Sequence, residues 1–431
     1  MISESFSINE KGHLTIGGAD ALELAAEYGT PLYVLDEEAI RRACRRYRSS
    51  LERFYGGNGR VLYASKAFCC KEIYRIVAGE GLGADVVSGG EIYTALEAGF
   101  PAGRLYFHGN NKTEDELRYA VQNGVGTIVV DNLTELRRLT GLLEETGRQQ
   151  DILLRIKPGI DAHTHSFIRT GQIDSKFGFA LETGEALEAV RAAAAAAPVR
   201  LKGLHCHIGS QIFDVEPFRH AAGVMADFMG EIKKETGLEL ETLNLGGGFG
   251  IQYVEKDDPA AYESYMEQVA AEVHSRCRRQ GIPIPEVLIE PGRSIVGGAG
   301  ATLYTVGALK EIPGVRTYLS VDGGMADNPR YALYGSEYEA VVCARAGEPR
   351  TETVTIAGKC CESGDLLAEG ASIQACGPGD ILAVLATGAY NYSMASNYNR
   401  LPRPAVVMVR GGQARLAVRR ESYADLVRND L

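Results

Sequence analysis

Residues 61–66 read VLYASK, a short apolar run that ends in small and polar residues and a lysine. Seven more runs of this kind follow, and the stretches between them have helical spacing. They are 83–88 (GADVVS), 105–110 (LYFHGN), 127–132 (TIVVDN), 153–158 (LLRIKP), 202–209 (KGLHCHIG), 242–248 (TLNLGGG) and 286–292 (EVLIEPG). Runs that are apolar on both faces are typical of buried parallel strands. Eight strand–helix units in about 230 residues predict an α/β fold of the (β/α)8 TIM-barrel type, with a doubly wound sheet as the alternative.

Several of the helical stretches carry boundary signals. Thr113 and Thr134 are good N-caps, and Pro198 ends a stretch with six consecutive alanines. Asp36 is the expected N-cap of the helix that enters the barrel. Helices are therefore expected over 36–54, 114–123, 135–146, 185–197 and 259–280.

After Ser294 the pattern changes to strand-like segments separated by Gly, Pro and Asn turns. These segments are 302–309, 315–321, 340–345, 352–356, 380–386, 405–410 and 414–419. Without long helices between them, they predict a mostly-β C-terminal domain. Residues 13–18 (HLTIGG) and 31–35 (PLYVL) are also strand-like and could join its sheet. The expected domains are N-terminal strands over 1–35, the barrel over 36–293 and the β domain over 294–431.

Composition narrows the class of protein. The chain has 431 residues and a net charge of −11 without a basic block, so nucleic acid is not an expected partner. No stretch approaches the roughly 20 apolar residues of a membrane helix, and the N-terminus lacks the features of a signal peptide. The nine cysteines include no CxxC pair, so structural zinc is not expected. We interpret the compartment as reducing and cytoplasmic.

Active sites of such barrels lie at the C-terminal ends of the strands. The first run ends in Lys66, which could form a Schiff base or simply reach solvent at the barrel mouth. The seventh run ends in three glycines, at 246–248, and the eighth is followed by Gly292 and Arg293. Glycines let backbone N–H groups approach an anion, and phosphate commonly binds after strands 7 and 8, although a tight turn alone would also use glycine.

Two further runs offer titratable side chains. Glu290 ends the eighth run and could be a salt-bridge partner or could keep the ring nitrogen of pyridoxal phosphate protonated. His205 and His207 are two residues apart and would face one side of a strand. Metal ligation, stacking on a cofactor ring with Ser210 donating to phosphate, and a satisfied core histidine all remain open for them.

Together the motifs resemble those of the alanine-racemase-like, fold-type III pyridoxal-phosphate decarboxylases and, within them, the diaminopimelate decarboxylases. The resemblance covers about residues 30–423. The motifs are YASKA (63–67), ADVVSGGE (84–91), PGIDAHTH (158–165), DSKFGF (174–179), HCHIGSQ (205–211), GGGFG (246–250), EPGRS (290–294), CESGD (361–365) and GAYNYSMASNYN (388–399). It implies pyridoxal 5'-phosphate as cofactor and decarboxylation of meso-2,6-diaminopimelate to L-lysine and CO2, the last step of lysine biosynthesis.

The resemblance also assigns residues. It makes Lys66 the Schiff-base lysine and pairs Glu290 with the pyridine nitrogen. Asp85 and His207 would flank the cofactor ring. The residues around the phosphate would be Ser210, Gly247, Gly248, Gly292, Arg293 and Tyr390. The substrate contacts would be Arg293, Arg330, Tyr334, Glu362 and Tyr390.

In this family CESGD reaches into the site of the partner subunit, which implies a homodimer with shared sites. Cys361 would then return a proton to Cα, as Lys66 could, and Glu362 would bind the distal ammonium. The family often has histidine where this chain has Cys360, which affects any argument about the acidity of Cys361. It also commonly has proline in place of Tyr331. Without the resemblance, Arg330 could be a surface arginine and Cys361 a small buried apolar residue.

Three other functions are alternatives. One is a decarboxylase of the same fold acting on ornithine, lysine, arginine, carboxynorspermidine or a biosynthetic-cluster substrate. Another is a non-catalytic pyridoxal-phosphate-binding protein, against which the C-terminal domain argues. The third is a racemase, which DSKFGF and CESGD fit poorly.

Overall fold

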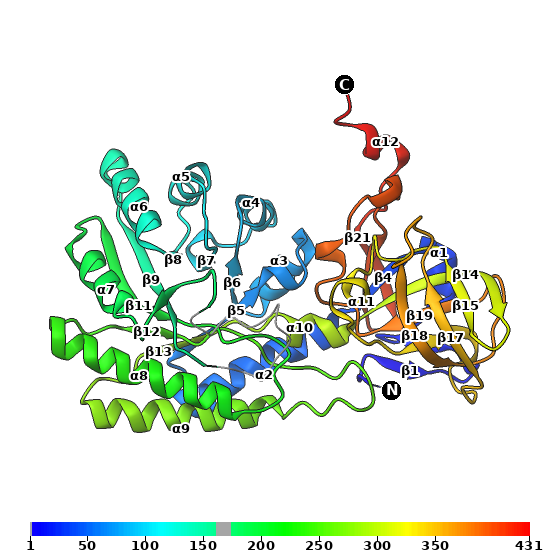
Figure 1. Cartoon of the computed structure of the whole chain (residues 1–431), viewed down its shortest axis with the longest axis horizontal. Helices are drawn as coiled ribbons and strands as arrows, with labels where there is room; N and C mark the ends of the chain where they lie inside the picture. Colours follow the sequence, from blue (N-terminus) through cyan, green and yellow to red (C-terminus); the bar gives the residue numbers. More distant parts are fainter. Residues whose placement is uncertain (1, 161–173) are drawn as a thin grey trace. The chain divides into compact units, whose positions relative to one another are not determined.

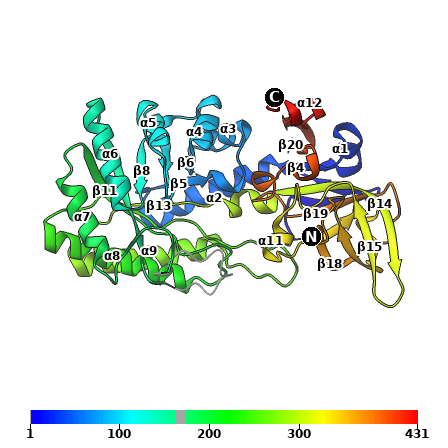
Figure 2. The same cartoon turned by 45° about the horizontal axis from the view of Figure 1, so that its top comes forward.

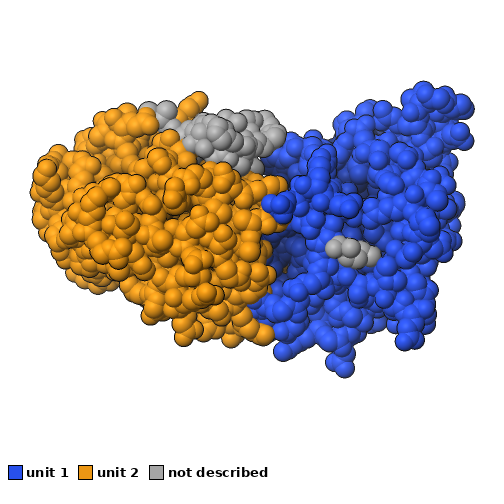
Figure 3. All heavy atoms as spheres, turned by 90° about the horizontal axis from the view of Figure 1, so that it is seen from below, with its two compact units in different colours: residues 1–42, 251–258, 293–431 blue, residues 43–250, 259–292 orange. Residues whose placement is uncertain are grey.

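A computed structural model describes residues 2–160 and 174–431. The chain forms two compact units. Unit 1 comprises Met1–Arg42, Ile251–Asp258 and Arg293–Leu431, and unit 2 comprises Ala43–Gly250 and Pro259–Gly292 (Figure 3).

The strands of unit 2 form a closed parallel barrel. In chain order they are β5 (Gly59–Ala64), β6 (Gly83–Val86), β7 (Leu105–Phe107), β8 (Thr127–Val130), β9 (Gln150–Lys157), β11 (Val199–His205), β12 (Thr242–Asn244) and β13 (Glu286–Ile289). Each pairs with the next, and β13 pairs with β5, so the ring has no open edge. The short β10 (Phe179–Ala180) adds to β9. The (β/α)8 prediction is confirmed, and closure excludes the doubly wound sheet.

Helices lie outside the ring of strands in both cartoon views (Figures 1 and 2). They are α3 (Lys71–Gly79), α4 (Gly89–Glu97), α5 (Glu114–Gln122), α6 (Leu133–Thr146), α7 (Glu185–Ala195), α8 (Glu216–Thr236) and α9 (Tyr262–Gln280), with α2 (Glu37–Tyr55) leading into the barrel. The apolar faces of these helices pack inward, as their three- and four-residue spacing requires.

The caps explain where several helices begin. Asp36 accepts hydrogen bonds from the N–H groups of Glu38 and Ala39, and Thr113 forms a capping box, so both expected caps are confirmed. The expected cap Thr134 is wrong. Asn132 accepts the N–H of Glu135 at 2.9 Å, and α6 therefore begins at Leu133. An asparagine directly after a strand is already extended, which is the conformation a cap needs.

Unit 1 is built mainly from strands. A small sheet holds β1 (Phe6–Ile8), β2 (Leu14–Ile16) and β3 (Ala19–Asp20), followed by α1 (Ala21–Tyr28). The large sheet holds β4 (Leu32–Asp36), β14 (Gly300–Ile312), β15 (Arg316–Val321), β16 (Ala340–Val342), β17 (Glu352–Ala357), β18 (Leu366–Ile373), β19 (Ile381–Leu385), β20 (Ala405–Arg410) and β21 (Gln413–Val418). The helices after Gly292 are short: α10 (Arg293–Val296), α11 (Arg330–Tyr334) and α12 (Tyr423–Val427). The mostly-β C-terminal domain is confirmed, and β4 lies between β14 and β20.

In the large sheet, β18 was missed from the sequence, as were the short strands β1, β3 and β10 elsewhere. Gly370 within β18 has a φ of 63°, and the pairing of β18 with β17 shifts register twice. These irregularities break the alternation of apolar and polar residues by which a strand is recognised. Among the described residues, no helix is long and apolar enough to cross a membrane.

A buried ion pair ties the carboxyl ends of two barrel strands to a helix. Lys112, in the loop after β7, donates to Glu135 Oε1 at 2.7 Å and to the carbonyl oxygens of Val129 at 2.7 Å and Gly109 at 2.9 Å. Both charged side chains are almost completely buried. Each proton of the ammonium therefore has an acceptor, which is the condition under which a buried charge is tolerated.

We expect Lys112→Met to lower the free energy of unfolding by about 3–5 kcal/mol, because Glu135 is left buried without its counter-ion. Chemical denaturation measures the change. The double variant Lys112→Met/Glu135→Leu should recover much of the loss. As a control, Lys71→Met removes the exposed pair with Glu97 (3.1 Å) and should cost less than about 1 kcal/mol. Equal costs for the two single variants would contradict the prediction.

Candidate active site

A lysine and a buried carboxylate lie together at the carboxyl end of the barrel. Lys66 is in the short 3-10 turn Ser65–Ala67 that follows β5, and Asp85 is in the neighbouring strand β6. Lys66 Nζ is 3.9 Å from Asp85 Oδ2. The lysine side chain is 42% exposed and the aspartate 2% exposed. The amine is thus accessible from outside the barrel while its counter-ion lies behind it.

Glu290 follows β13 and is surrounded by three polar side chains. His108 Nε2 lies 2.8 Å from Oε1, Asn244 Nδ2 donates to Oε1 at 2.7 Å, and His205 Nε2 lies 3.2 Å from Oε2. Burial alone would raise the pKa of Glu290, but His108 and His205 beside it hold the pKa well below its ordinary value. Burial raises the pKa of Asp85, although His108 and Lys66 oppose the shift. The two buried carboxyl groups are therefore pushed in opposite directions, and Glu290 is the one held ionised.

The two predicted histidines have different partners. Strand β11 ends at His205, so His207 lies beyond the strand and the expectation that they share one strand face does not hold. Burial lowers the pKa of His205 to about 3, and it also lowers the pKa of His207 well below the ordinary value. A neutral His205 donates from Nε2 to Glu290, whereas His207 Nδ1 accepts the N–H of Gly247 at 3.3 Å. Both rings are thus neutral, with the proton on Nε2.

The glycines after β12 allow three loops to pack backbone against backbone. A Cβ on Gly247 would lie 2.1 Å from the carbonyl oxygen of Glu290, and one on Gly248 would lie 2.5 Å from that of Gly209. Gly246 and Gly248 also have φ values of 69° and 115°. No other residue fits there, so the tight approach of the loops itself requires glycine. Ser210 lies in the loop after β11, and Gly292 packs against Ala64, where a Cβ would be 2.9 Å from the alanine Cβ.

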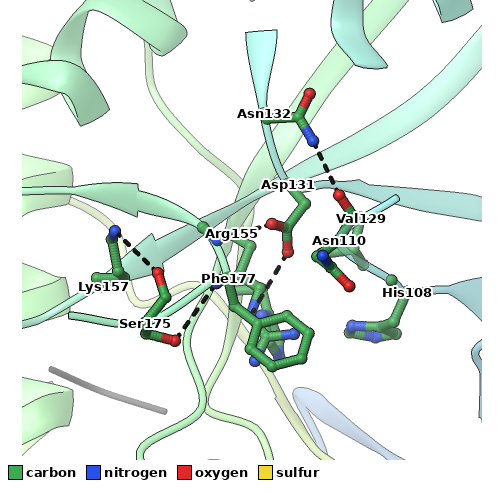
Figure 4. A network of polar contacts seen from close by, with 12 residues as sticks. His108, Asn110, Val129, Asp131, Asn132, Arg155, Lys157, Ser175 and Phe177 are labelled. Carbon is green, nitrogen blue, oxygen red and sulfur yellow. Dashed lines mark hydrogen bonds and ion pairs between the residues drawn. The ribbon is translucent and has the colours of Figure 1, made fainter. Parts of the chain in front are cut away.

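A second polar network lies beside this cluster (Figure 4). The Arg155 guanidinium lies 4.2 Å from the ring centre of Phe177, and its Nε is 3.9 Å from Asp131 Oδ2. The N–H of Gly178 donates to Asp131 Oδ1 at 2.8 Å. Phe177 and Gly178 belong to the DSKFGF motif, which therefore covers a buried arginine. Most of the PGIDAHTH motif falls within 161–173, outside the described residues.

Sequence reasoning missed three residues of this site: His108, Asn244 and Arg155. Each lies within or directly after a strand that was identified, in LYFHGN, TLNLGGG and LLRIKP. Polar residues at the carboxyl ends of buried barrel strands are a usable signal, and applying it to every run would have found all three.

The predicted substrate-binding residues of unit 1 form a cluster of arginines and tyrosines. Arg293 and Arg330 are both buried, and their guanidinium carbons lie 4.7 Å and 5.4 Å from the ring centre of Tyr390. Arg330 also lies 4.8 Å from the ring of Tyr334, and Arg293 donates to the hydroxyl of Tyr253 at 2.5 Å. Burial excludes the surface interpretation of Arg330. Tyr390 has a φ of 64°, a strained value that is often found at binding sites.

The CESGD segment exposes two of the predicted residues. Cys361 and Glu362 are exposed, which excludes the interpretation of Cys361 as a buried apolar residue. The backbone N–H of Cys361 donates to Asn399 Oδ1 at 2.7 Å. The preceding Cys360 is buried, and burial raises its pKa to about 12. Asp365 accepts the N–H groups of Cys360 and Met325, each at 2.6 Å, and so fixes the start of the segment.

The residues of the barrel fit pyridoxal phosphate. The Lys66 amine is accessible to an aldehyde, and the ionised Glu290 can accept a hydrogen bond from a protonated ring nitrogen. Asp85 Oδ1 and His205 Nδ1 are buried without a hydrogen-bond partner among the described residues, so polar capacity is left at the site. His108, His205 and Glu290 also bring possible metal-ligand atoms within 4.8 Å of one another. In this arrangement, however, the imidazole nitrogens face the carboxylate itself.

The neutral state of His205 predicts a pH dependence of stability. The unfolded chain binds a proton at this histidine below about pH 6.5, whereas the folded chain does so only near pH 3. The free energy of unfolding should therefore fall as the pH falls, by roughly 1 kcal/mol for such a histidine between pH 7 and pH 5.5. His205→Gln should reduce this dependence by that amount in chemical denaturation, and His220→Gln, on the exposed side of α8, should not. Identical pH profiles for the wild type and His205→Gln would contradict a neutral His205.

Comparisons with known proteins bear on both units. Residues 37–297 match the family described as pyridoxal-dependent decarboxylase, pyridoxal binding domain. The diaminopimelate decarboxylase of Bacillus subtilis (strain 168) is 52% identical over 423 residues, covering 98% of this chain and 96% of that protein. The diaminopimelate decarboxylase of Mycobacterium tuberculosis (strain ATCC 25618 / H37Rv) is 44% identical over 428 residues, covering 97% and 95%.

A solved structure agrees with these relatives. The crystal structure of diaminopimelate decarboxylase from M. jannaschii in co-complex with L-lysine has a TM-score of 0.92 and 36% sequence identity, and the match covers 100% of this chain and 98% of that one. Pyridoxal phosphate is accordingly the cofactor, and the chain is a carboxy-lyase. With the barrel, the lysine and the ionised carboxylate in place, this chain belongs to the diaminopimelate decarboxylase family of pyridoxal-dependent decarboxylases.

Proposed function

We propose that the chain decarboxylates meso-2,6-diaminopimelate at its D-centre and releases L-lysine and CO2, as the last step of lysine biosynthesis. The observation that carries the proposal is the presence of an accessible amine, Lys66, and a buried ionised carboxylate, Glu290, after two adjacent strands of one barrel. The names of the similar proteins support the choice of substrate.

Pyridoxal phosphate, when bound, accepts the electron pair that remains on Cα after CO2 leaves, provided its ring nitrogen stays protonated. In the proposal, Glu290 keeps the proton on the ring nitrogen, because its ionised carboxylate accepts a hydrogen bond from that nitrogen and is already oriented by Asn244 and His205. Lys66 would hold the cofactor through its side-chain amine. Asp85 and His207 would lie beside the ring, and a neutral His207 would add no charge there.

The phosphate is assigned to the glycine-lined loops after β12 and β13. Gly247, Gly248 and Gly292 carry no side chain of their own to block an anion, the N–H of Gly247 also donates to His207 Nδ1, and Ser210 adds a hydroxyl to these loops. The family resemblance adds Arg293 and Tyr390 to this group.

The substrate must be recognised by both of its ends. A diaminopimelate molecule keeps a second amino-acid group, with one carboxylate and one ammonium, after CO2 has left. In the proposal, Arg330, Tyr334 and Arg293 bind carboxylate, Glu362 binds the distal ammonium, and Tyr390 contacts both substrate and phosphate. Polar groups built for such contacts reject analogues that lack a partner, because they would remain unpaired.

We also propose that the chain works as a homodimer, in a reducing cytoplasmic compartment. The exposure of Cys361 and Glu362 supports a role towards a second subunit, since both side chains are open to another molecule. Cys361 or Lys66 then returns a proton to Cα. None of the nine cysteines forms a disulfide, which suits a reducing environment.

The substrate proposal is tested by CO2 release from meso-diaminopimelate, L-lysine, L-ornithine and L-arginine. We expect kcat/KM for meso-diaminopimelate to exceed the others by roughly 10⁴-fold, because each of the others lacks the second carboxylate. Lys66→Ala should remove both the activity and the visible absorbance of the bound cofactor. Release of CO2 from ornithine or lysine but not from diaminopimelate would overturn the substrate.

The shared site is tested by mixing two inactive variants, Lys66→Ala and Glu362→Ala. A mixed dimer would contain one site with both residues intact, so we expect up to about a quarter of wild-type activity to return if exchange is random and the two subunits are equal. Exchange is verified with differently tagged subunits. Proven exchange without any recovered activity would contradict shared sites.

A further inference from the structure

Asn244 is a buried amide between Glu290 and the glycine loop at 246–248. It ends β12 and is 0% exposed. Its Nδ2 donates to Glu290 Oε1 at 2.7 Å, and its Oδ1 accepts the N–H of Gly246 at 2.9 Å. The N–H of Glu290 in turn donates to the carbonyl oxygen of Gly246 at 2.8 Å. These bonds close a ring that joins the carboxylate to the first residue of the loop.

Only an amide satisfies both neighbours of this side chain. The carboxylate of Glu290 needs a donor and the N–H of Gly246 needs an acceptor, and asparagine offers one of each at this length. Leucine, of similar volume, would remove the acceptor for the N–H of Gly246 and the amide donor to Glu290, which would keep only His205 and His108 beside it. Aspartate offers acceptors alone unless it carries a proton. The two neighbours also fix which way the amide points.

We infer that Asn244 is a positioning residue for the cofactor: it holds the Glu290 carboxylate in place and ionised, and it couples that carboxylate to the loop that is assigned to the phosphate. A neutral donor stabilises the anion without cancelling its charge, unlike a lysine or arginine at the same place. Asn244 acts through Glu290 and Gly246. The inference rests on the cofactor placement proposed above and does not depend on the identity of the substrate.

The variant Asn244→Asp tests whether the hydrogen bond donated by residue 244 to Glu290 matters, or only the volume of its side chain. Two buried carboxyl groups 2.7 Å apart cannot both ionise readily, so the pair retains one proton with a raised pKa. With that proton on residue 244, its O–H replaces the amide N–H, and its other oxygen still accepts from Gly246. As the pH rises through the pKa of the pair, the proton is lost and the two carboxylates repel. Cofactor binding should then weaken with rising pH.

The measurement is the dissociation constant of pyridoxal phosphate for cofactor-free protein, followed by absorbance at pH 6 and pH 9 and divided by the wild-type value at each pH. For Asn244→Asp we expect a ratio within about threefold at pH 6 and above about tenfold at pH 9, since one pKa unit of coupling is a tenfold effect. Asn244→Leu should give a similar raised ratio at both pH values. As a control, Asn132→Asp changes the N-cap of α6, where aspartate also caps well, and its ratio should stay near one at both pH values.

Two outcomes would overturn the inference. One is a ratio near one for Asn244→Asp at both pH values. The other is an equally raised ratio at both, because either result means that the donated proton is not what matters. Thermal unfolding of the cofactor-free variants shows whether each is folded, and the aspartate variant alone carries the test if the leucine variant is not. A wild type that binds pyridoxal phosphate but releases no CO2 from diaminopimelate would contradict the proposed substrate and leave this inference intact.

Discussion

A buried carboxylate sets the conditions that the rest of the barrel must meet. Glu290 is 6% exposed and cannot remain ionised unless donors surround it. The donors come from the carboxyl ends of β11 and β12, and the His108 ring after β7 lies 2.8 Å from the carboxylate. Asn244 and His205 are neutral donors, so they stabilise the negative charge and leave it available to a cationic partner. The role proposed for Glu290 depends on this, because a carboxylate neutralised by arginine would be a poorer partner for a protonated ring nitrogen.

Other buried charges near the barrel mouth are paired with an opposite charge or lie against an aromatic ring. Lys112 is paired directly with Glu135, and Arg155 lies between Asp131 and the face of Phe177. The charges of these buried ions are balanced by groups within the protein and stabilise the fold. Lys66 differs from Lys112 and Arg155, since it is partly exposed and Asp85, 3.9 Å away, has a raised pKa. The barrel mouth therefore separates charges that stabilise the fold from charges that remain open to a ligand.

Unit 1 carries a different kind of chemistry. Its buried arginines lie against tyrosine rings, an arrangement that fixes the orientation of the planar guanidinium groups. The left-handed conformation of Tyr390 brings one ring near both Arg293 and Arg330. The exposed Cys361 and Glu362 lie on a segment that Asp365 fixes through backbone hydrogen bonds. Unit 1 thus presents both positive and negative groups, as the proposed recognition of a substrate with two charged ends requires.

The sequence by itself determined the barrel, the β domain and the residue types at the strand ends. Periodicity and turn residues are local properties, and the eight runs, Lys66, Glu290 and the glycines at 246–248 are all visible in them. It could not show that Asn132 caps α6 in place of Thr134, nor that β18 forms despite its irregular pairing, because cap choice and register depend on what packs alongside. Only the tertiary structure decided that His205 donates to Glu290 while His207 accepts the N–H of Gly247. It also brought His108 and Asn244 beside the Glu290 carboxylate. The reason is physical: hydrogen bonds and pKa shifts depend on distances of a few ångströms between side chains from different strands, and those distances exist only once the barrel has closed.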